Sequence, residues 1–300
     1  ALVVALTGSL VRTPLAVWRG WIRERRWGFS TQGLGGFLGD RAKGLALGGV
    51  LSALGLVGLV GIARSLPGTW PLVAAPVAAA FVLLLGFIAP VLLEPVFNRF
   101  APLADEALSS ELLALAARVG VPVREVLVAD ASRRTTKVNA YVSGIGRTRR
   151  VVVYDTLLAR NEPAQIGLIV AHELGHRRAR HVLVGTLIGM ASAALAVVLL
   201  WAILGTRIGE PRTVPLVLLL ATGFELAVLP FQSWLSRQFE YAADRFSLEA
   251  TGDLAAFEGA HRELALANLS DLDPPPLAYA LLFTHPTASQ RIAAAARSAV

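Results

Sequence analysis

The sequence contains no cysteine and only one methionine, Met190, among its 300 residues. Without cysteine, the chain can form neither a disulfide framework nor a thiolate metal site, and it has no cysteine nucleophile. Histidine is also rare, with five residues, and charged residues make up only 16% of the chain. Because the one methionine is internal and the sequence opens within an apolar run, we expect further chain upstream of Ala1.

Hydrophobic residues, in contrast, are abundant at 55%, and the mean hydropathy is +0.59. This composition predicts an integral membrane protein. A helix needs about 20 apolar residues to cross about 30 Å of hydrocarbon. Four segments meet that requirement, at residues 44–63, 70–93, 182–204 and 214–234. Residues 1–18 resemble the end of a fifth span, interrupted by Arg12.

Basic residues are concentrated between residues 19 and 43, whereas the links at 64–69 and 205–213 are short. Positively charged loops mark the cytoplasmic side of a membrane protein. With four spans, residues 94–181 and the tail after residue 235 both return to that side. Membrane topology therefore accounts for most of the net charge of +7, and we expect no nucleic-acid partner.

Residues 171–176 read AHELGH, an HExxH motif within a predicted helix that starts near Asn161. Residues four apart lie one above the other on a helix, so His172 and His176 can share one ion while Glu173 lies beside it. Neutral imidazoles suit Zn2+, and a site with three protein ligands leaves one position for water, whose proton a nearby carboxylate can take. HExxH also occurs by chance. Two of only five histidines at ligand spacing, on a helix that is otherwise apolar, favour a zinc site.

A zinc site of this kind requires a third protein ligand. Glu240 is the preferred candidate, because Asp244 lies four residues later on the same helical face and can hold the second ring nitrogen of a histidine ligand. Glu225 is the alternative, since a carboxylate inside a membrane span usually has a function, which could also be proton transfer in a transporter. The structural interpretation of Glu240 is a surface residue paired with Arg237.

Residues 94–181 form a soluble insert between the second and third spans. A helix is predicted at 104–119, and three strands at 123–129, 136–142 and 150–154. Gly144 and Gly146 between the last two strands suggest a hairpin. The free edge of such a sheet could bind an extended substrate as an added strand, or the hairpin could serve only to pack against the metal helix.

No proline or glycine separates the HExxH motif from the third span. We therefore predict one continuous helix of about 40 residues, on the order of 60 Å long. Such a helix would place the metal at the membrane surface or just within it. His181, about 140° around this helix from His176, is interpreted as an interfacial residue rather than a ligand.

Several stretches of the sequence together carry a family resemblance. They are residues 26–30, 97–100, 139–141, 172–176, 236–244 and 284–286, followed by Arg291. In this order and at these separations, the chain resembles the integral-membrane zinc metalloproteases of the CaaX prenyl protease type 1 family, which are related to the HtpX heat-shock membrane proteases. HExxH alone would be weak evidence, but the whole set is specific.

The resemblance implies one Zn2+ per chain, held by His172, His176 and Glu240, with Glu173 as the general base. It also implies that Asn139 and Ala140 belong to the strand that binds the substrate backbone, which favours the functional interpretation of the hairpin.

The resemblance also assigns a role near the C-terminus. His285 and Arg291 match a pair thought to stabilise the oxyanion and order the site, whereas spacing alone would read them as surface residues. Eukaryotic members of the family have seven spans that enclose an aqueous chamber, and four or five are visible here.

The predicted fold is a mainly α membrane protein, a multi-span helical bundle that carries a small α+β zincin-like (gluzincin) catalytic domain on the cytoplasmic side. We expect membrane helices in residues 1–94, then a cytoplasmic helix, a small β-sheet and the HExxH helix in 95–181. Two membrane helices follow in 182–234, and a C-terminal catalytic segment with the third zinc ligand occupies 235–300. The predicted location is the cell membrane, with several spans.

The predicted function is that of a zinc-dependent endopeptidase that hydrolyses membrane-associated or CaaX-like protein substrates with metal-activated water. Cleavage of other membrane proteins or of misfolded proteins fits the same residues. The alternative is a catalytically inactive scaffold or pseudoprotease, which would keep the helices and lose the metal or the base. Because every catalytic group is present, we prefer the enzyme.

Overall fold

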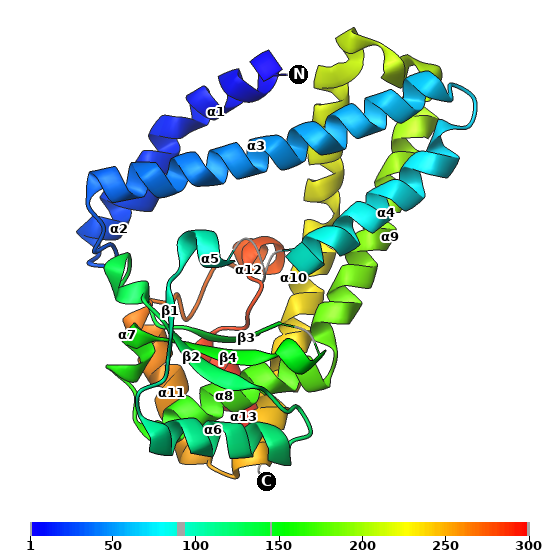
Figure 1. The fold of residues 1–300 in the computed structure, drawn as a ribbon. Coiled ribbons are helices and arrows are strands. Elements are labelled where there is room, and N and C mark those ends of the chain that lie inside the picture. The colour runs from blue at the N-terminus through cyan, green and yellow to red at the C-terminus, as the bar shows by residue number, and fades with distance from the viewer. Residues whose placement is uncertain (1, 89–93, 145, 299–300) are drawn as a thin grey trace. The chain divides into compact units, whose positions relative to one another are not determined.

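The computed structural model describes residues 2–88, 94–144 and 146–298. The chain divides into two compact units, each made from two separate stretches. The first unit consists of residues 1–89 and 184–227, and the second of residues 90–183 and 228–300. Figure 1 labels their helices and strands.

The first unit is mainly helical in its described residues. Its elements are α1 (Leu2–Val17), the π-helix η1 (Trp18–Ile22), α2 (Arg23–Arg26), α3 (Leu34–Ser65), α4 (Trp70–Ile88), η5 (Gly205–Gly209) and η6 (Pro211–Thr213), with parts of α9 (His181–Leu204) and α10 (Val214–Thr251). Trp70 is fully buried, and its indole Nε1 donates a hydrogen bond to the carbonyl of Gly205 over 3.2 Å. Arg64 likewise donates to the carbonyl of Gly209 over 2.7 Å. These two bonds tie the link between α3 and α4 to η5.

Three segments of the described chain are long and apolar enough to cross a membrane. They are Leu34–Ser65, His181–Gly209 and Pro211–Thr251, and Trp70–Gly86 is a shorter apolar helix. The spans predicted at 44–63, 182–204 and 214–234 lie within the three long segments. The span predicted at 70–93 coincides with α4 as far as Ile88, and residues 89–93 lie outside the described residues.

The second unit contains a small mixed sheet and several helices. In the part of the chain that is described, these are α5 (Glu94–Phe97), β1 (Phe100–Pro102), α6 (Glu106–Arg118), β2 (Glu125–Ala129), η3 (Ala131–Arg133), β3 (Ala140–Ser143), η4 (Gly146–Thr148), β4 (Arg150–Tyr154), α7 (Asp155–Leu158), α8 (Pro163–Arg178), α11 (Leu254–Ala267), α12 (Pro276–Leu282) and α13 (Ala288–Ser298), together with the second half of α10. The predicted fold class, mainly helical with a small α+β region, is confirmed.

The sheet has the strand order β1-β2-β4-β3, so β3 is an edge strand. β2 pairs parallel with β4, while β1 and β3 pair antiparallel with their neighbours. The predicted hairpin is confirmed as the antiparallel pair of β3 and β4, with Ala140 opposite Val153 and Ser143 opposite Arg150. β3 begins at Ala140, however, four residues later than predicted, and the short strand β1 was not predicted.

Side chains point alternately to the two faces of the sheet along each strand, and apolar residues lie on both faces. One face, with Val126, Val151 and Val153, packs against the main core, to which α6 and α8 contribute. The opposite face carries a smaller cluster of Leu127, Ala129 and Val152.

The two core helices begin at clear capping signals. Asp105 caps α6 by accepting a hydrogen bond from the N–H of Leu108 over 2.9 Å. Glu162 and Gln165 form a capping box at the start of α8, where Pro163 is the first helical residue. These caps satisfy N–H groups that would otherwise lack a partner at a helix end.

The prediction of one continuous helix through the HExxH motif and the third span is wrong. α8 ends at Arg178, and α9 begins at His181. Between them Arg180 adopts a positive φ of 58°. This left-handed backbone breaks the ladder of helical hydrogen bonds without proline or glycine, so the chain changes direction immediately after the motif.

Candidate metal centre

Three predicted ligands come together in the second unit. His172 and His176 project from α8, and Glu240 projects from α10, with potential ligand atoms all within 4.8 Å of one another. The Nε2 atoms of the two histidines are 3.1 Å apart. Glu240 places one carboxylate oxygen 3.4 Å from Nε2 of His172 and the other 3.3 Å from Nε2 of His176.

The approach of α10 to α8 depends on a glycine inside the motif. A Cβ atom at Gly175 would lie 3.0 Å from Cδ1 of Phe246 and 3.3 Å from the backbone Cα of Ala243, both on α10. Contacts this short are tighter than ordinary van der Waals contacts, so a side chain here would require Phe246 or the backbone of α10 to shift. Gly175 therefore allows the backbones of the two helices to pack closely enough for Glu240 to face the histidines.

The donor atoms have the spacing and chemistry that zinc requires. A tetrahedral Zn2+ with bonds of about 2.0–2.1 Å holds its ligand atoms about 3.3 Å apart, and imidazole nitrogen with carboxylate oxygen is one of its common donor sets. The two Nε2 atoms, 3.1 Å apart, and the distance of 3.3 or 3.4 Å from each of them to one of the two oxygens of Glu240 are close to that value. His172 and Glu240 are only 8% and 5% exposed, so the site is shielded from bulk water.

Asp244 holds the other ring nitrogen of His172, as its spacing from Glu240 suggested. Nδ1 of His172 lies 2.9 Å from Oδ1 of Asp244. With its proton on Nδ1, the imidazole donates to this carboxylate and turns the lone pair of Nε2 toward the ligand cluster.

Arg291 of α13 completes this arrangement. Its Nε donates to Oδ2 of Asp244 over 2.7 Å, and its Nη2 donates to Oδ1, which makes a bidentate ion pair. Nη1 of Arg291 also lies 3.5 Å from Oε2 of Glu240. Burial alone would lower the pKa of Arg291, but the bonds to Asp244 and the charge of Glu240 raise it above its ordinary value. Arg291 therefore supplies a permanent positive charge to two carboxylates of the centre.

Glu173 lines the pocket beside the ligand cluster and does not belong to the cluster itself. Burial raises the pKa of its carboxyl group above the ordinary value, against the opposing influence of His172 and His176. A carboxylate with a raised pKa is a better proton acceptor near neutral pH than an exposed glutamate.

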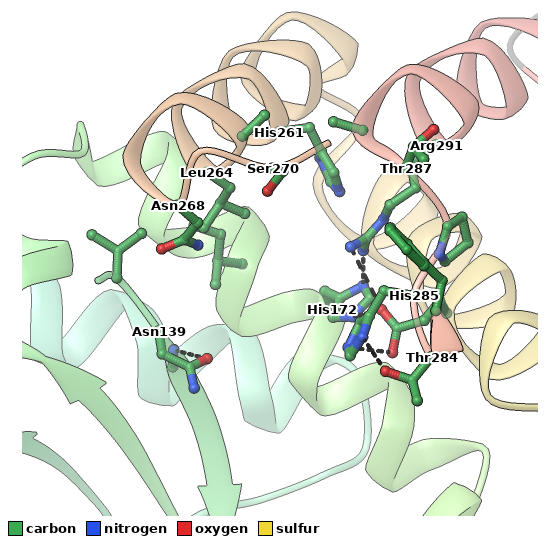
Figure 2. Close-up of a pocket in the computed structure, with 18 of the residues that line it drawn as sticks. Asn139, His172, His261, Leu264, Asn268, Ser270, Thr284, His285, Thr287 and Arg291 are labelled. Carbon is green, nitrogen blue, oxygen red and sulfur yellow. Dashed lines mark hydrogen bonds and ion pairs between the residues drawn. The ribbon is translucent and has the colours of Figure 1, made fainter. Parts of the chain in front are cut away.

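The pocket has a volume of about 540 Å3 and combines residues from five parts of the second unit. Figure 2 shows His172, His285 and Arg291 gathered on one side and Asn139 on the other. Nε2 of His285 lies 3.5 Å from Oε1 of Glu240. Asn139 and Ala140, at the edge strand, also line the pocket. The structure thus brings together every residue that the sequence predicted for the site.

Two regions of the chain match described families. Residues 102–299 match peptidase family M48, and residues 1–99 match the CAAX prenyl protease N-terminal region, described as five membrane helices. The chain belongs to peptidase family M48. It is a multi-pass membrane metallopeptidase, and the cluster of His172, His176 and Glu240 is the metal-binding site of an M48 enzyme.

Similar proteins come from bacteria and eukaryotes. The chain is 31% identical to the uncharacterized metalloprotease YhfN of Bacillus subtilis (strain 168), over 97% of this chain and 71% of that protein. It is 30% identical to the probable CAAX prenyl protease 1 of Schizosaccharomyces pombe, of which it covers 54%. Among solved structures, that of S. mikatae Ste24p has a TM-score of 0.83 and 26% identity, covering 97% of this chain and 73% of the other.

The sequence left two alternatives open, Glu225 as the third ligand and Glu240 as a surface partner of Arg237. Glu225 is not part of the cluster of described residues that could hold a metal. Arg237, the surface partner considered for Glu240, instead donates hydrogen bonds to the carbonyls of Tyr279 and Phe283, over 3.1 and 2.6 Å. Arg237 thereby holds α12 and the start of the segment that carries His285.

Sequence reasoning missed two histidines of the centre. His181 was assigned to the membrane interface, yet its Nδ1 lies 3.0 Å from Nδ1 of His176. His261 was not considered, and its Nε2 lies 3.8 Å from Oδ1 of Asp244. All five histidines of the chain therefore lie at or beside the metal site. Their scarcity was the one signal in the sequence that could have indicated this.

Proposed function

We propose that this M48 chain is a membrane-embedded zinc endopeptidase that hydrolyses peptide bonds of membrane-associated protein substrates, CaaX-like proteins among them. The observation that carries the proposal is the cluster of two imidazole nitrogens 3.1 Å apart, each 3.3 to 3.4 Å from one carboxylate oxygen of Glu240, beside a carboxylate that is not a ligand. The names of several similar proteins, which are CAAX prenyl proteases, support the substrate class.

The proposed roles follow from the position of each group. His172, His176 and Glu240 would hold one Zn2+, which when bound supplies Lewis acidity and lowers the pKa of water. Glu173 takes a proton from the attacking water and returns it to the leaving amine, as its place in the pocket and its raised pKa support.

Two further groups stabilise negative charge, one on the substrate and one on the carboxylates of the site. His285 donates a hydrogen bond to the substrate carbonyl oxygen as negative charge develops on it. Arg291 orients Asp244, and through it His172, and offsets the charge of the carboxylates around the site.

The edge strand β3 supports binding of the substrate as an added strand. Tyr154 N–H donates to the carbonyl of Asn139 over 3.0 Å, so the backbone groups of Asn139 face β4. In an antiparallel pair the next residue, Ala140, then directs its backbone away from β4, toward the free edge. Its N–H lies 2.9 Å from the side-chain oxygen of Asn139, which leaves the Ala140 carbonyl for a substrate N–H. A peptide aligned on this edge would pass the metal site, because both residues line the pocket.

We also propose a membrane arrangement from the distribution of charges. Membrane helices occupy residues 1–94 and 182–234, and the catalytic regions occupy residues 95–181 and 235–300. Basic residues between positions 19 and 43 would lie in the cytoplasm, and the catalytic regions on the same side.

Two substitutions test the proposed chemistry. Glu173→Gln should keep zinc stoichiometry and thermal stability while abolishing hydrolysis of a reporter peptide, because Glu173 is not a ligand. His172→Ala should lose zinc and activity together. Wild-type activity in Glu173→Gln would remove this residue from the mechanism, and a wild-type protein that binds zinc without any hydrolysis would favour the scaffold.

A further inference from the structure

The two metal-ligating histidines have different partners behind them. Nδ1 of His172 is held by the carboxylate of Asp244, over 2.9 Å. Nδ1 of His176 instead faces another imidazole, with Nδ1 of His181 3.0 Å away. Among the described residues, no carboxylate or carbonyl group forms a hydrogen bond with Nδ1 of His176.

The break between α8 and α9 makes this contact possible. In a continuous helix, a residue five positions beyond His176 would point about 140° away from it. The positive φ of Arg180, 58°, interrupts the helix instead, so that His181 begins α9 with its ring in contact with His176.

The ring of His181 is also fixed from a second direction. It stacks on Phe239 of α10, with centroids 4.1 Å apart and planes 8° from parallel. Phe239 directly precedes the ligand Glu240. One aromatic contact and one hydrogen bond therefore hold the His181 ring between the helices that provide all three ligands.

The hydrogen bond between the two imidazoles determines which nitrogen atoms carry a proton. A hydrogen bond between two Nδ1 atoms contains one proton, so one ring donates and the other accepts. Nε2 of His176 lies 3.3 Å from Oε1 of Glu240 and faces the ligand cluster, where its lone pair is needed for the metal. The proton of His176 must then be on Nδ1, and His181 must accept it.

We propose that His181 is a positioning residue that fixes the tautomer and ring orientation of His176 for metal binding, the role that Asp244 has for His172. This inference rests on the proposed zinc peptidase function. An acceptor behind a ligating histidine typically changes metal affinity by 10- to 100-fold.

Two variants separate the hydrogen bond from the aromatic contact. His181→Phe keeps a ring that can stack on Phe239 and removes the acceptor. His181→Asn loses the ring but can place its side-chain oxygen close to the position of Nδ1. We expect zinc affinity, measured in detergent by competition with a chelator, to fall 10- to 100-fold in His181→Phe and to stay within a few-fold of wild type in His181→Asn.

Two readouts distinguish this role from a merely structural one. Thermal unfolding of the metal-free protein should be similar in His181→Asn and wild type. The visible absorption of the cobalt-substituted protein should change in His181→Phe, because a misoriented imidazole alters the ligand field. If His181→Phe does not fold, His181→Leu carries the same expectation.

The possible results give different conclusions. Wild-type zinc affinity and cobalt spectrum in His181→Phe would overturn the proposal, as would equal loss of affinity in both variants. A wild-type protein that binds no zinc would instead contradict the proposed function, and a wild-type protein that binds zinc but hydrolyses nothing would leave this positioning role intact.

Discussion

His285 is a largely exposed side chain next to an almost buried one. Its side chain is 63% exposed, whereas that of Glu240, 3.5 Å away, is 7% exposed. Such a residue adds little to folding but can reach a substrate in the pocket. We expect His285→Ala to keep zinc and thermal stability while lowering kcat about 100- to 1000-fold, because a donor to the developing oxyanion is lost.

Measurements of kcat, KM and zinc content on one preparation check this expectation. Loss of zinc would make His285 a ligand and reopen the assignment of Glu240. Unchanged turnover would mean that His285 is only a surface residue.

His261 predicts a pH dependence of stability. It is 4% exposed and stacks on Phe257, and burial lowers its pKa to about 4, with the charge of Arg291 acting in the same direction. The unfolded chain therefore takes up a proton near pH 6.5 that the folded chain refuses until about pH 4. Stability should fall as the pH decreases from about 7 toward 4, by about 2 kcal/mol at pH 5.

The matched variant is His261→Leu, which cannot titrate. Thermal unfolding of both proteins at pH 7 and pH 5, with a chelator present so that metal release does not contribute, gives the difference that belongs to His261. Equal losses in the two proteins would show that this imidazole is not buried in its neutral form.

At the scale of elements, the centre depends on how closely α8 and α10 pack. In Gly175→Ala the new Cβ would lie 3.3 Å from the backbone Cα of Ala243 and 3.0 Å from the ring of Phe246. We expect α10 to move away, with stability reduced by about 1–3 kcal/mol and zinc bound more weakly because Glu240 moves with the helix.

Gly167→Ala is the control on the same helix. An added Cβ there has no heavy atom within 4 Å. It should stabilise α8 by up to about 1 kcal/mol through helix propensity alone and leave zinc affinity unchanged. If Gly175→Ala behaved like Gly167→Ala in unfolding and chelator-competition experiments, close packing at Gly175 would not be required.

The elements with local signals were predicted well. The helix expected at 104–119 is α6 (Glu106–Arg118), which is capped by Asp105, and the HExxH helix, expected to start near Asn161, begins at Pro163. β2 and β4 follow from their β-branched runs. What failed had no local signal: three-residue β1 depends on pairing with β2, and the break at Arg180 comes from a positive φ in a residue that rarely adopts one.

The same limit applies to the site. HExxH spacing was enough to choose His172 and His176, and four-residue spacing related Asp244 to Glu240. The contact of His181 with His176 could not be predicted, because it depends on the helix break. The approach of α13 to α10, which joins Arg291 to Asp244, has no signature in the local sequence. Only the family resemblance pointed to His285 and Arg291.

For the whole molecule, both compact units are assembled from two distant stretches of chain. Residues 90–183 and 228–300 form the unit that contains the metal site, and the chain between them contributes to the other unit. His172 and His176 come from the first stretch, and Glu240 from the second. A complete ligand set therefore requires the intervening hydrophobic helices to return the chain to its starting side. This requirement ties the assembly of the active site to membrane insertion.

The same requirement places both catalytic stretches on one side of the membrane, and we expect this to be the cytoplasmic side. The chain has no native cysteine, so single cysteines report their own position. Cysteine at position 147 or in place of Ala255 lies in the catalytic unit, and Arg212→Cys lies in the short link before α10, where the side chain is 82% exposed. With basic residues 19–43 in the cytoplasm, an impermeant maleimide should label positions 147 and 255 from the cytoplasmic side and position 212 from the outer side of oriented vesicles. Labelling of 147 and 255 only from the outer side would reverse the proposed topology, while a split between these two positions would contradict the pairing of both catalytic stretches on one side.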